Sequence, residues 1–344
     1  MKFYPSVTII VLIWILSVSM IFFIGKEGNF FESLSNWDGG HYIGIAQNGY
    51  SEKFQYAFFP LYPITINLLN NFVGNYLLSA VLISIISTFF GLQLLYKLMS
   101  LDFDRKIADK VIAGILIFPT SFYFLTAYSE GLFFLLTIAA FYFLRTRKLF
   151  WAVVFASLAS ATRLSGLAVV LGLIIEVYLT EGINKKNWYI LLSPLGFLIY
   201  CYFLYTNTGD PFYFITAENH WLRSLSIPGL GFWETLKSIF TPQFIEKNIT
   251  AVTDLIFSIF GLGMVIRAFR FLPISYCLFA FISVALPLFT PSLSSIPRFL
   301  LPVFPIFILL AFIKDRNLSF FYQLLFIMLL SAFSIMYISG KWVA

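Results

Sequence analysis

The sequence predicts an all-α, polytopic membrane protein with about eleven transmembrane helices. Sixty per cent of the 344 residues are apolar and only 11% are charged, and the mean hydropathy is +0.89. Apolar runs of roughly 17 to 25 residues recur along the chain, and such runs cross a bilayer as helices because lipid offers no partner to an unpaired backbone amide. A soluble protein, with about a quarter of its residues charged, is excluded. We expect one integral membrane domain over residues 1–344.

The expected spans are the apolar runs between charged or turn-forming connections. They are Pro5–Ile24, Tyr76–Leu98, Ile107–Leu125, Gly131–Leu144, Leu149–Ala161, Leu164–Leu179, Trp188–Tyr205, Ala251–Ala268, Leu272–Phe289, Phe299–Ile313 and Leu318–Ile338. The first follows Lys2, and we expect a retained anchor because its apolar run is long for a signal peptide and no small-residue cleavage site follows.

Basic residues divide unequally between the two sides that these spans define. With the N-terminus in the cytoplasm, 14 of the 22 lysines and arginines lie inside and 8 lie outside, as the positive-inside rule requires. The net charge of +6 then divides into +8 inside and −2 outside. The basic balance therefore indicates topology, and a nucleic-acid partner is not expected.

The topology depends on how residues 149–180 cross the membrane. As one helix this segment would be ~48 Å long, well beyond a hydrocarbon core of ~30 Å. We expect two short spans that meet around Arg163. One long tilted helix is the alternative, and it would invert everything downstream. The short basic connections Arg267–Arg270 and Lys314–Arg316 favour two spans, because only then do they lie in the cytoplasm.

Cysteine and histidine are too few for a metal or disulfide framework. Cys201 and Cys277 both fall within expected spans, and His41 and His220 are the only histidines. A divalent metal is therefore not indicated, and no cofactor is expected.

The first outer loop, residues 25–63, carries the most polar cluster of the chain, Asn36-Trp37-Asp38-Gly39-Gly40-His41-Tyr42. The pattern fits a short interfacial helix over Trp37–Ala46 that ends at Asn48-Gly49. Its N-cap would be Ser35 or Asn36, and Asp38 would lie in its first turn. Pro60 and Pro63 then predict a rigid turn into the next membrane segment.

Asp38 is the candidate catalytic residue, although an acidic residue also stabilises a helix start. Gly39 and Gly40 would let a ligand approach the backbone closely. Trp37 and Tyr42 would form an aromatic wall suited to a sugar ring or a lipid headgroup. His41 is a candidate substrate contact, with a solvated or hydrogen-bonded structural role as the alternative.

Three further charged residues are expected at the same outer face. A charge at membrane depth costs roughly 2.5 to 3.5 kcal/mol on insertion scales, so each must have a partner or lie at the water boundary. Glu130, after Tyr128 and Ser129, would cap a helix, or orient a substrate hydroxyl, or hold an arginine. Arg163 and Arg298 would either extend to the interface or bind a phosphate through their planar donor fork.

A long outer loop over residues 207–248 completes the expected site. It contains Glu218-Asn219-His220-Trp221-Leu222-Arg223 and an amphipathic stretch over Trp233–Phe240 that fits an interfacial helix. The loop would cover the site as a lid or hold an acceptor, with His220 as a substrate contact. A simple solvated connector is the alternative.

The order of these motifs resembles the PIG-V family of mannosyltransferases, which includes the enzymes that add the second mannose to glycosylphosphatidylinositol precursors and their prokaryotic relatives. The resemblance extends over about the first half of the chain. It is carried by Trp37-Asp38-Gly39-Gly40-His41-Tyr42, Ile45-Ala46, Gly49-Tyr50, Phe59-Pro60-Leu61-Tyr62-Pro63, Pro119, Tyr128-Ser129-Glu130 and Thr162-Arg163-Leu164-Ser165-Gly166. Leu164-Ser165-Gly166 departs from the family pattern, in which an asparagine precedes the glycine.

The resemblance implies the GT-C fold and a lipid-phosphate-linked sugar as donor. It also implies that Asp38 acts as the catalytic carboxylate. The expected function is inverting transfer of a sugar, mannose by resemblance, from a polyprenyl phosphate to a lipid or glycan acceptor. Arg163 or Arg298 would bind the phosphate, and the orienting contacts would be Trp37, His41, Tyr42, Tyr128, Glu130 and His220.

Two other classes of protein fit the hydropathy. A transporter or lipid flippase is one, although its ionisable sites would lie near the bilayer midplane and its halves would be related. A noncatalytic subunit of a membrane glycosylation complex is the other. Short loops and a composition rich in Phe, Ile and Asn favour a bacterial plasma membrane over the endoplasmic reticulum, with the site on the outer or lumenal face.

Overall fold

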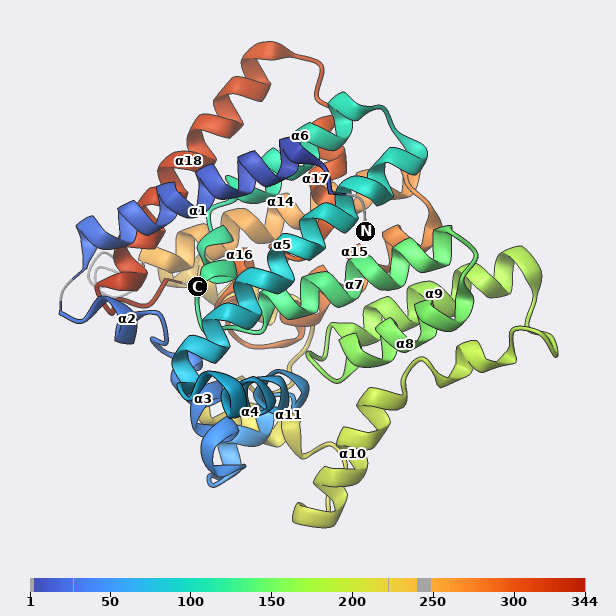
Figure 1. Cartoon of the computed structure of the whole chain (residues 1–344), viewed down its shortest axis with the longest axis horizontal. Helices are drawn as coiled ribbons and strands as arrows, with labels where there is room; N and C mark the ends of the chain where they lie inside the picture. Colours follow the sequence, from blue (N-terminus) through green and yellow to red (C-terminus); the bar gives the residue numbers. More distant parts are fainter. Residues whose placement is uncertain (1–2, 27, 222, 240–248, 344) are drawn as a thin grey trace.

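A computed structural model describes residues 3–26, 28–221, 223–239 and 249–343, and all regular secondary structure within them is helical (Figure 1). The α-helices are α1 (Pro5–Gly25), α2 (Phe30–Ser33), α3 (Asp38–Asn48), α4 (Leu61–Val73), α5 (Tyr76–Asp102), α6 (Arg105–Leu116), α7 (Glu130–Arg145), α8 (Leu149–Ser160), α9 (Gly166–Glu181), α10 (Leu195–Thr208), α11 (Tyr213–Ala217), α12 (Leu230–Ile239), α14 (Ile249–Phe271), α15 (Ile274–Ala285), α16 (Ile296–Leu300), α17 (Phe304–Ala311) and α18 (Arg316–Ile338). Short 3-10 helices are η1 (Lys53–Ala57), η2 (Ser121–Leu125), η3 (Trp188–Leu192), η4 (Glu218–Trp221) and η5 (Leu286–Phe289).

Within the described residues, five helical segments, not eleven, are long and apolar enough to cross a membrane alone. They are Pro5–Gly25, Tyr76–Asp102, Trp188–Thr208, Thr250–Phe271 and Arg316–Ile338. The other expected spans form shorter helices or helices broken by turns. The all-helical membrane class is therefore confirmed, whereas the number of spans is not.

Some of the shorter helices lie in the interior of the bundle, where a helix does not have to be long. The expected span over residues 299–313 shows why. It breaks after Leu300 at a turn containing Pro302, and α17 then covers only eight buried residues. Irregular backbone at membrane depth is tolerated where neighbouring protein surrounds it, because that protein supplies the missing hydrogen bonds. Hydropathy alone detects the apolar run and misses the break.

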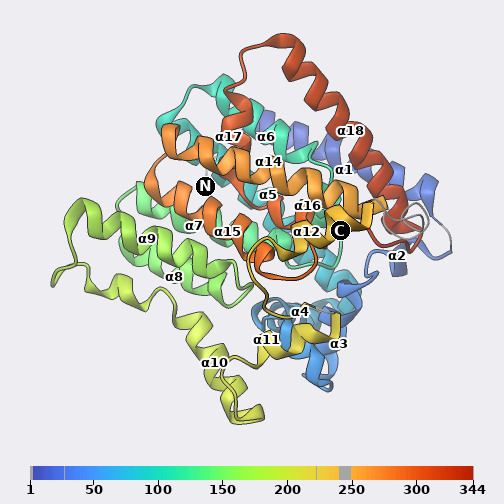
Figure 2. The ribbon, with the colours of Figure 1, turned by 180° about the vertical axis from the view of Figure 1, so that it is seen from behind.

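The segment over residues 149–180 is divided as expected. It forms α8 and α9, which lie side by side in both views (Figures 1 and 2) and are joined by the turn that carries Arg163. Gly166 begins α9 in close contact with α8, since a Cβ added there would lie 2.3 Å from the carbonyl oxygen of Ala159. One long helix is therefore excluded.

One helix from each expected outer loop, α3 and α11, lies at one end of the molecule together with α4 (Figures 1 and 2). The helix expected in the first loop is present as α3 and ends where Gly49 adopts φ 74°, whereas its expected position at the membrane interface stays a prediction. The expected turn at Pro60 and Pro63 instead begins α4. Proline is compatible with a first helical turn because the amide hydrogens there need no helical acceptor.

The second outer loop packs back onto the bundle. The amphipathic stretch expected from Trp233 is helical as α12, which contacts η5 and α14. Gly231 makes this contact close, because a Cβ there would lie 2.6 Å from the carbonyl oxygen of Thr290. The stretch was expected to extend to Phe240. That residue and the rest of the loop, residues 240–248, lie outside the described residues.

Candidate active site

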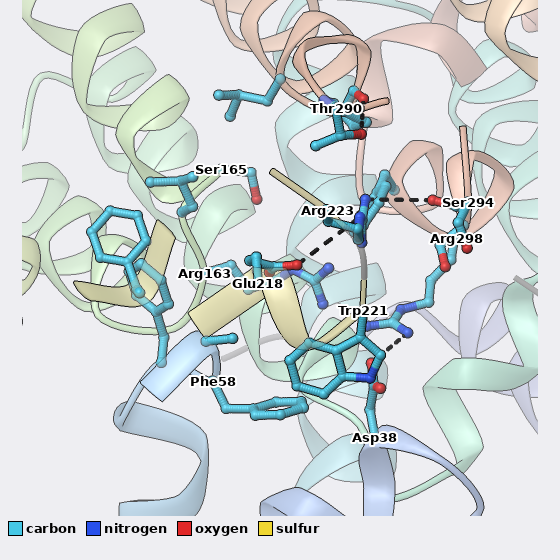
Figure 3. Close-up of a pocket in the computed structure, with 18 of the residues that line it drawn as sticks. Asp38, Phe58, Arg163, Ser165, Glu218, Trp221, Arg223, Thr290, Ser294 and Arg298 are labelled. Atoms are coloured by element: carbon cyan, nitrogen blue, oxygen red, sulfur yellow. Dashed lines mark hydrogen bonds and ion pairs between the residues drawn. The ribbon is translucent and has the colours of Figure 1, made fainter. Parts of the chain in front are cut away.

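A cavity of about 800 Å³ opens at this end of the molecule (Figure 3). Six parts of the chain line it: Trp37 and the start of α3, residues 57–59, the turn between α8 and α9, the second outer loop, the region from the end of α15 to Pro302, and Trp342. The charged side chains on its wall are those of Asp38, Arg163, Glu218, Arg223 and Arg298. The cavity therefore joins segments from the start to the end of the chain.

Asp38 begins α3 from a turn that the rest of the fold holds in place. The preceding residue, Trp37, has φ 59° and ψ −122° and makes no side-chain cap bond. Such a conformation costs a non-glycine residue of order 1–3 kcal/mol, and it persists only where surrounding contacts impose it. The hydroxyl of Tyr128 donates to the carbonyl oxygen of Asn36 at 2.8 Å, and the Asn36 amide donates to the carbonyl oxygen of Tyr337 at 2.8 Å.

The expected cap of α3 was wrong, because both candidate side chains are engaged elsewhere. Asn36 bonds to Tyr337, and the Ser35 hydroxyl donates to the carbonyl oxygen of Glu32 at 2.8 Å. Gly39 was expected to let a ligand approach the backbone closely, and the structure shows a different arrangement. The glycine is buried, and a Cβ there would lie 3.3 Å from the carbonyl oxygen of Ala127. The close approach is therefore between α3 and the turn before α7.

Two arginines and two carboxylates form one connected network. Nη1 of Arg298 lies 2.7 Å from Oδ2 of Asp38, and its Nε lies 2.6 Å from Oε1 of Glu130. Nη1 of Arg163 lies 2.6 Å from the same Glu130 oxygen. Arg163 and Arg298 side chains are only 12% and 6% exposed, so neither extends to the surface. Of the three further charges expected from the sequence, Arg298 thus contacts Asp38 directly, and Glu130 and Arg163 are connected to it through Arg298.

Glu130 is fully buried and stabilises the site through its contacts with the two arginines. Its side chain has 0% exposure and it does not line the cavity, which differs from the expected contact with substrate. Ser129 does not cap α7 with its side chain; its hydroxyl instead receives a hydrogen bond from Arg163 at 3.1 Å and bonds to the Tyr42 hydroxyl at 2.9 Å. The close packing of Gly131 against α5 fixes this helix start, since a Cβ there would lie 2.6 Å from the carbonyl oxygen of Ser84.

Besides the two carboxylates, two tyrosine rings and the fixed backbone of α16 hold Arg298 in place. Its Cζ lies 5.0 Å from the ring centre of Tyr128 and 5.4 Å from that of Tyr123. The backbone of α16 is fixed by the buried carboxylate of Asp254, which accepts a hydrogen bond from the amide of Ile296 at 2.9 Å. Tyr128 is fully buried and does not line the cavity. Its expected contact with substrate is therefore replaced by a contact with the arginine.

Aromatic side chains form the opposite wall of the cavity. The His41 ring lies 5.3 Å from that of Phe58 and 6.1 Å from that of Trp221, and His220 stacks on Phe54 with ring centres 4.2 Å apart. Burial is the main cause that lowers the pKa of His41, against the opposing charge of Asp38. A neutral imidazole among aromatic rings suits contact with an uncharged sugar or alkyl group.

Several cavity residues were not among those expected from the sequence. Trp342, near the C-terminus, lies with its ring centre 5.2 Å from that of Trp37. Glu218 and Arg223 line the wall from the second outer loop, with Arg223 Nε 4.0 Å from Glu218 Oε2. Burial raises the pKa of Glu218, although Arg223 opposes this effect. The sequence showed these two residues only as two charges among several in the second outer loop, with no local pattern that places them at the cavity.

The site contains no clustered metal ligands in the part of the chain that the structure describes, where no group of three or more His, Cys, Asp or Glu side chains converges. Positive charge is supplied instead by Arg163, Arg223 and Arg298. Guanidinium groups match the oxygens of a phosphate or a carboxylate through paired N–H donors. The chemistry available is therefore a carboxylate on the cavity wall beside fixed cations.

Residues 6–191, more than half of the chain, match the family described as Mannosyltransferase (PIG-V). A comparison with curated proteins finds no match.

One solved structure is similar in fold: ArnT from Cupriavidus metallidurans bound to undecaprenyl phosphate. The TM-score is 0.54 and the sequence identity 16%, and the match covers 92% of this chain and 62% of that one. At this identity the likeness shows the fold alone, and that fold is the expected GT-C architecture. By its match over residues 6–191, the chain belongs to the PIG-V mannosyltransferase family.

Proposed function

We propose that this protein transfers a mannosyl group from a polyprenyl-phosphate-linked donor to a hydroxyl group of a lipid or glycan acceptor at the outer face of a membrane. The observation that carries the proposal is the placement of Asp38. Its carboxylate lies on the wall of the cavity and is fixed by Arg298 at 2.7 Å. The family supplies mannose, and a polyprenyl phosphate bound to ArnT supports the donor class.

Asp38 is the best placed of the three carboxylates near the cavity to act as the base. Glu130 is fully buried and shares one oxygen between two arginines. Glu218 also lines the cavity, but its ion pair with Arg223 is long, at 4.0 Å, so its carboxylate is less firmly positioned than that of Asp38. Asp38 faces the cavity with a side chain that is 16% exposed, so an acceptor hydroxyl can reach it.

The reaction that this arrangement supports is a single displacement at the anomeric carbon. The acceptor oxygen attacks that carbon, and its proton passes to the Asp38 carboxylate as in general-base catalysis. The bond between the anomeric carbon and the phosphate oxygen breaks, and its electron pair leaves with the polyprenyl phosphate. Attack opposite the leaving group inverts the anomeric configuration, as in inverting glycosidases.

The leaving phosphate gains negative charge as that bond breaks. Fixed cations close to the developing charge lower the barrier because they need no reorganisation during the reaction. Arg163 and Arg298 both line the cavity and are held by Glu130. No divalent metal is needed in this scheme, since guanidinium groups carry the compensating charge.

The proposal is tested by adding radiolabelled mannosyl phosphoryl undecaprenol to membranes that contain the wild-type protein or Asp38→Asn. The wild type should label a glycolipid or glycan, and the product should carry the anomeric configuration opposite to that of the donor. Asp315→Asn is the matched control, because Asp315 caps α18 through its side chain and asparagine caps equally well. Equal labelling by wild type and Asp38→Asn at equal protein levels would refute the assignment of Asp38.

The same assay separates the competing classes. A transporter or flippase would move the donor across a vesicle membrane without forming a new glycosidic bond. A noncatalytic subunit would lose its assembly with other subunits when Asp38 is changed, while turnover by the remaining enzyme persists. Transfer by the purified chain alone would exclude both.

A further inference from the structure

Three guanidinium groups line the cavity, and their contacts differ in strength. Arg163 and Arg298 each approach Glu130 to 2.6 Å, and Arg298 also approaches Asp38 to 2.7 Å. Arg223 has much longer contacts: its Nε lies 4.0 Å from Glu218 Oε2, and its Nη2 lies 3.5 Å from the carbonyl oxygen of Ser294. Of the three, Arg223 is therefore the least neutralised by its neighbours.

The Nε atom of Arg223 is buried and donates no hydrogen bond to any described residue. A buried donor without an acceptor carries a desolvation penalty, and that penalty disappears when a ligand supplies the acceptor. The Arg223 side chain is 17% exposed and projects into the cavity between Glu218 and Ser294 (Figure 3). An anion in the cavity can reach it without a rearrangement of the backbone.

One aromatic ring brings Arg223 to the same part of the cavity as Arg163. The Cζ atom of Arg223 lies 5.2 Å from the ring centre of Phe299, and that of Arg163 lies 5.7 Å from it. Arg298 precedes Phe299 in the chain and is committed to the two carboxylates. The Cζ atom of Arg298 lies 5.9 Å from the same ring centre, so all three guanidinium groups meet around Phe299. Among them, Arg223 has the longest ion-pair contact and Arg163 is its neighbour that does not pair with Asp38.

Glu218 is a weak partner for Arg223. Its side chain is 38% exposed, and its Oε2 lies 4.0 Å from Nε of Arg223. A long ion pair at a partly exposed site contributes little free energy, so an anion that binds Arg223 more closely can displace Glu218. A phosphate offers more acceptor oxygens and, as a monoester, a charge of about −1.5 to −2.

Resting on the proposed function, we propose that Arg223 binds the phosphate of the polyprenyl-linked donor together with Arg163, and that Glu218 is the counterion which this phosphate displaces. The donor phosphate is a diester with one negative charge. When the bond to the anomeric carbon breaks, the electron pair stays on the phosphate oxygen and the charge increases. Arg223 then offsets the charge of the leaving group while Arg298 continues to hold Asp38.

The test is the affinity of the purified full-length protein, in lipid nanodiscs, for undecaprenyl phosphate and for its neutral analogue undecaprenol. Arg223→Gln should weaken binding of undecaprenyl phosphate by about 10- to 100-fold, the effect of losing charge-assisted hydrogen bonds. Binding of undecaprenol should not change. Glu218→Gln should tighten binding of undecaprenyl phosphate by about threefold, because the competing anion is removed. The double variant should bind like Arg223→Gln.

Arg267→Gln is the matched control, because Arg267 also lies over a phenylalanine ring, 5.4 Å from the centre of Phe271, and does not line the cavity. Its affinity for undecaprenyl phosphate should equal that of the wild type. If Arg223→Gln does not fold, the affinity of Glu218→Gln for undecaprenyl phosphate tests the inference by itself, because this variant keeps every arginine. Unchanged affinity in Arg223→Gln, or in Glu218→Gln where Arg223→Gln fails to fold, would overturn the inference.

The proposed donor class and the proposed role of Arg223 can be refuted separately. If the wild type binds undecaprenyl phosphate no better than undecaprenol, the proposed donor class is wrong. If the wild type prefers the phosphate and Arg223→Gln retains that preference, the donor class stands and the role of Arg223 is wrong.

Discussion

Arg298 and Asp38 form an ion pair of 2.7 Å between Nη1 and Oδ2 that joins the start of α3 to α16. The candidate base is thus positioned by a residue from the other end of the chain. The same guanidinium binds Glu130 through Nε, so one planar group sets the distance between the buried carboxylate and the one on the cavity wall. The geometry of the site depends on this planarity as well as on charge.

Arg298→Lys should therefore inactivate the protein although it keeps the charge. An ammonium group has no planar fork and cannot reproduce the paired Nε and Nη1 contacts. Displacement of a catalytic group by about 1 Å costs on the order of 100-fold in rate. The check is kcat for mannosyl transfer, with Arg267→Lys as the control. A kcat equal to that of the wild type would show that the bidentate geometry is not required.

Glu130→Gln should destabilise the fold. The change leaves Arg163 and Arg298 in a buried place without their shared carboxylate, and breaking such a pair costs about 3–5 kcal/mol. Removing one of the two cations as well, in Glu130→Gln with Arg163→Gln, should recover part of that loss, because residues in one network couple. The measurement is the free energy of unfolding in detergent. Strictly additive losses would contradict a shared network.

Gly39→Ala should impair transfer, whereas Gly40→Ala should not. A Cβ at Gly39 would lie 3.3 Å from the carbonyl oxygen of Ala127 and would push α3 away from the turn before α7. At Gly40 the nearest atom would be the carbonyl oxygen of Ser35, at an ordinary contact distance of 3.6 Å. Both changes raise helix propensity equally. The transfer rates of the two variants separate the effect of close packing at Gly39 from that of helix propensity. Equal rates would contradict a role for this packing.

The residues of the site that could be predicted from sequence were those with a high cost of burial. Asp38, Glu130, Arg163 and Arg298 stand out because a charge within an apolar chain must have a partner, and the structure brings all four together. The division at Arg163 was also predictable, because a single helix would have exceeded the bilayer. The start of α3 was not, since Ser35 and Asn36 find tertiary partners that no local pattern reveals.

The remaining errors have one physical origin, which is contact between distant segments. The number of spans is not confirmed, because a buried helix such as α17 resembles a membrane span in composition but not in length. Trp342 was missed because its contact with Trp37 joins the two ends of the chain. Arg223 and Glu218 were visible as charges in a loop, but only the fold places them on the wall of the cavity.

His41 should make the stability of the protein sensitive to mild acid. Burial lowers its pKa below the usual 6.5, so the folded protein favours the neutral ring. The resulting stabilisation is fully present above pH 6.5 and is lost as the pH falls through the lowered folded value. His41→Phe keeps the contacts with Phe54 and Phe58 and removes the titration. The melting temperature of the wild type should therefore fall more than that of the variant between pH 7.5 and 5.5. Parallel curves would contradict this assignment.

Asp38 is proposed to accept the proton of the acceptor hydroxyl. Loss of its carboxylate should leave the rest of the site intact. The most direct measurement is kcat of Asp38→Asn at saturating donor and acceptor, made beside its affinity for undecaprenyl phosphate. We predict that kcat falls by about 10²- to 10⁴-fold, the usual contribution of a general base, while the affinity for undecaprenyl phosphate stays within about threefold of the wild type because Arg163 and Arg223 remain. A kcat close to that of the wild type, with binding preserved, would contradict the claim.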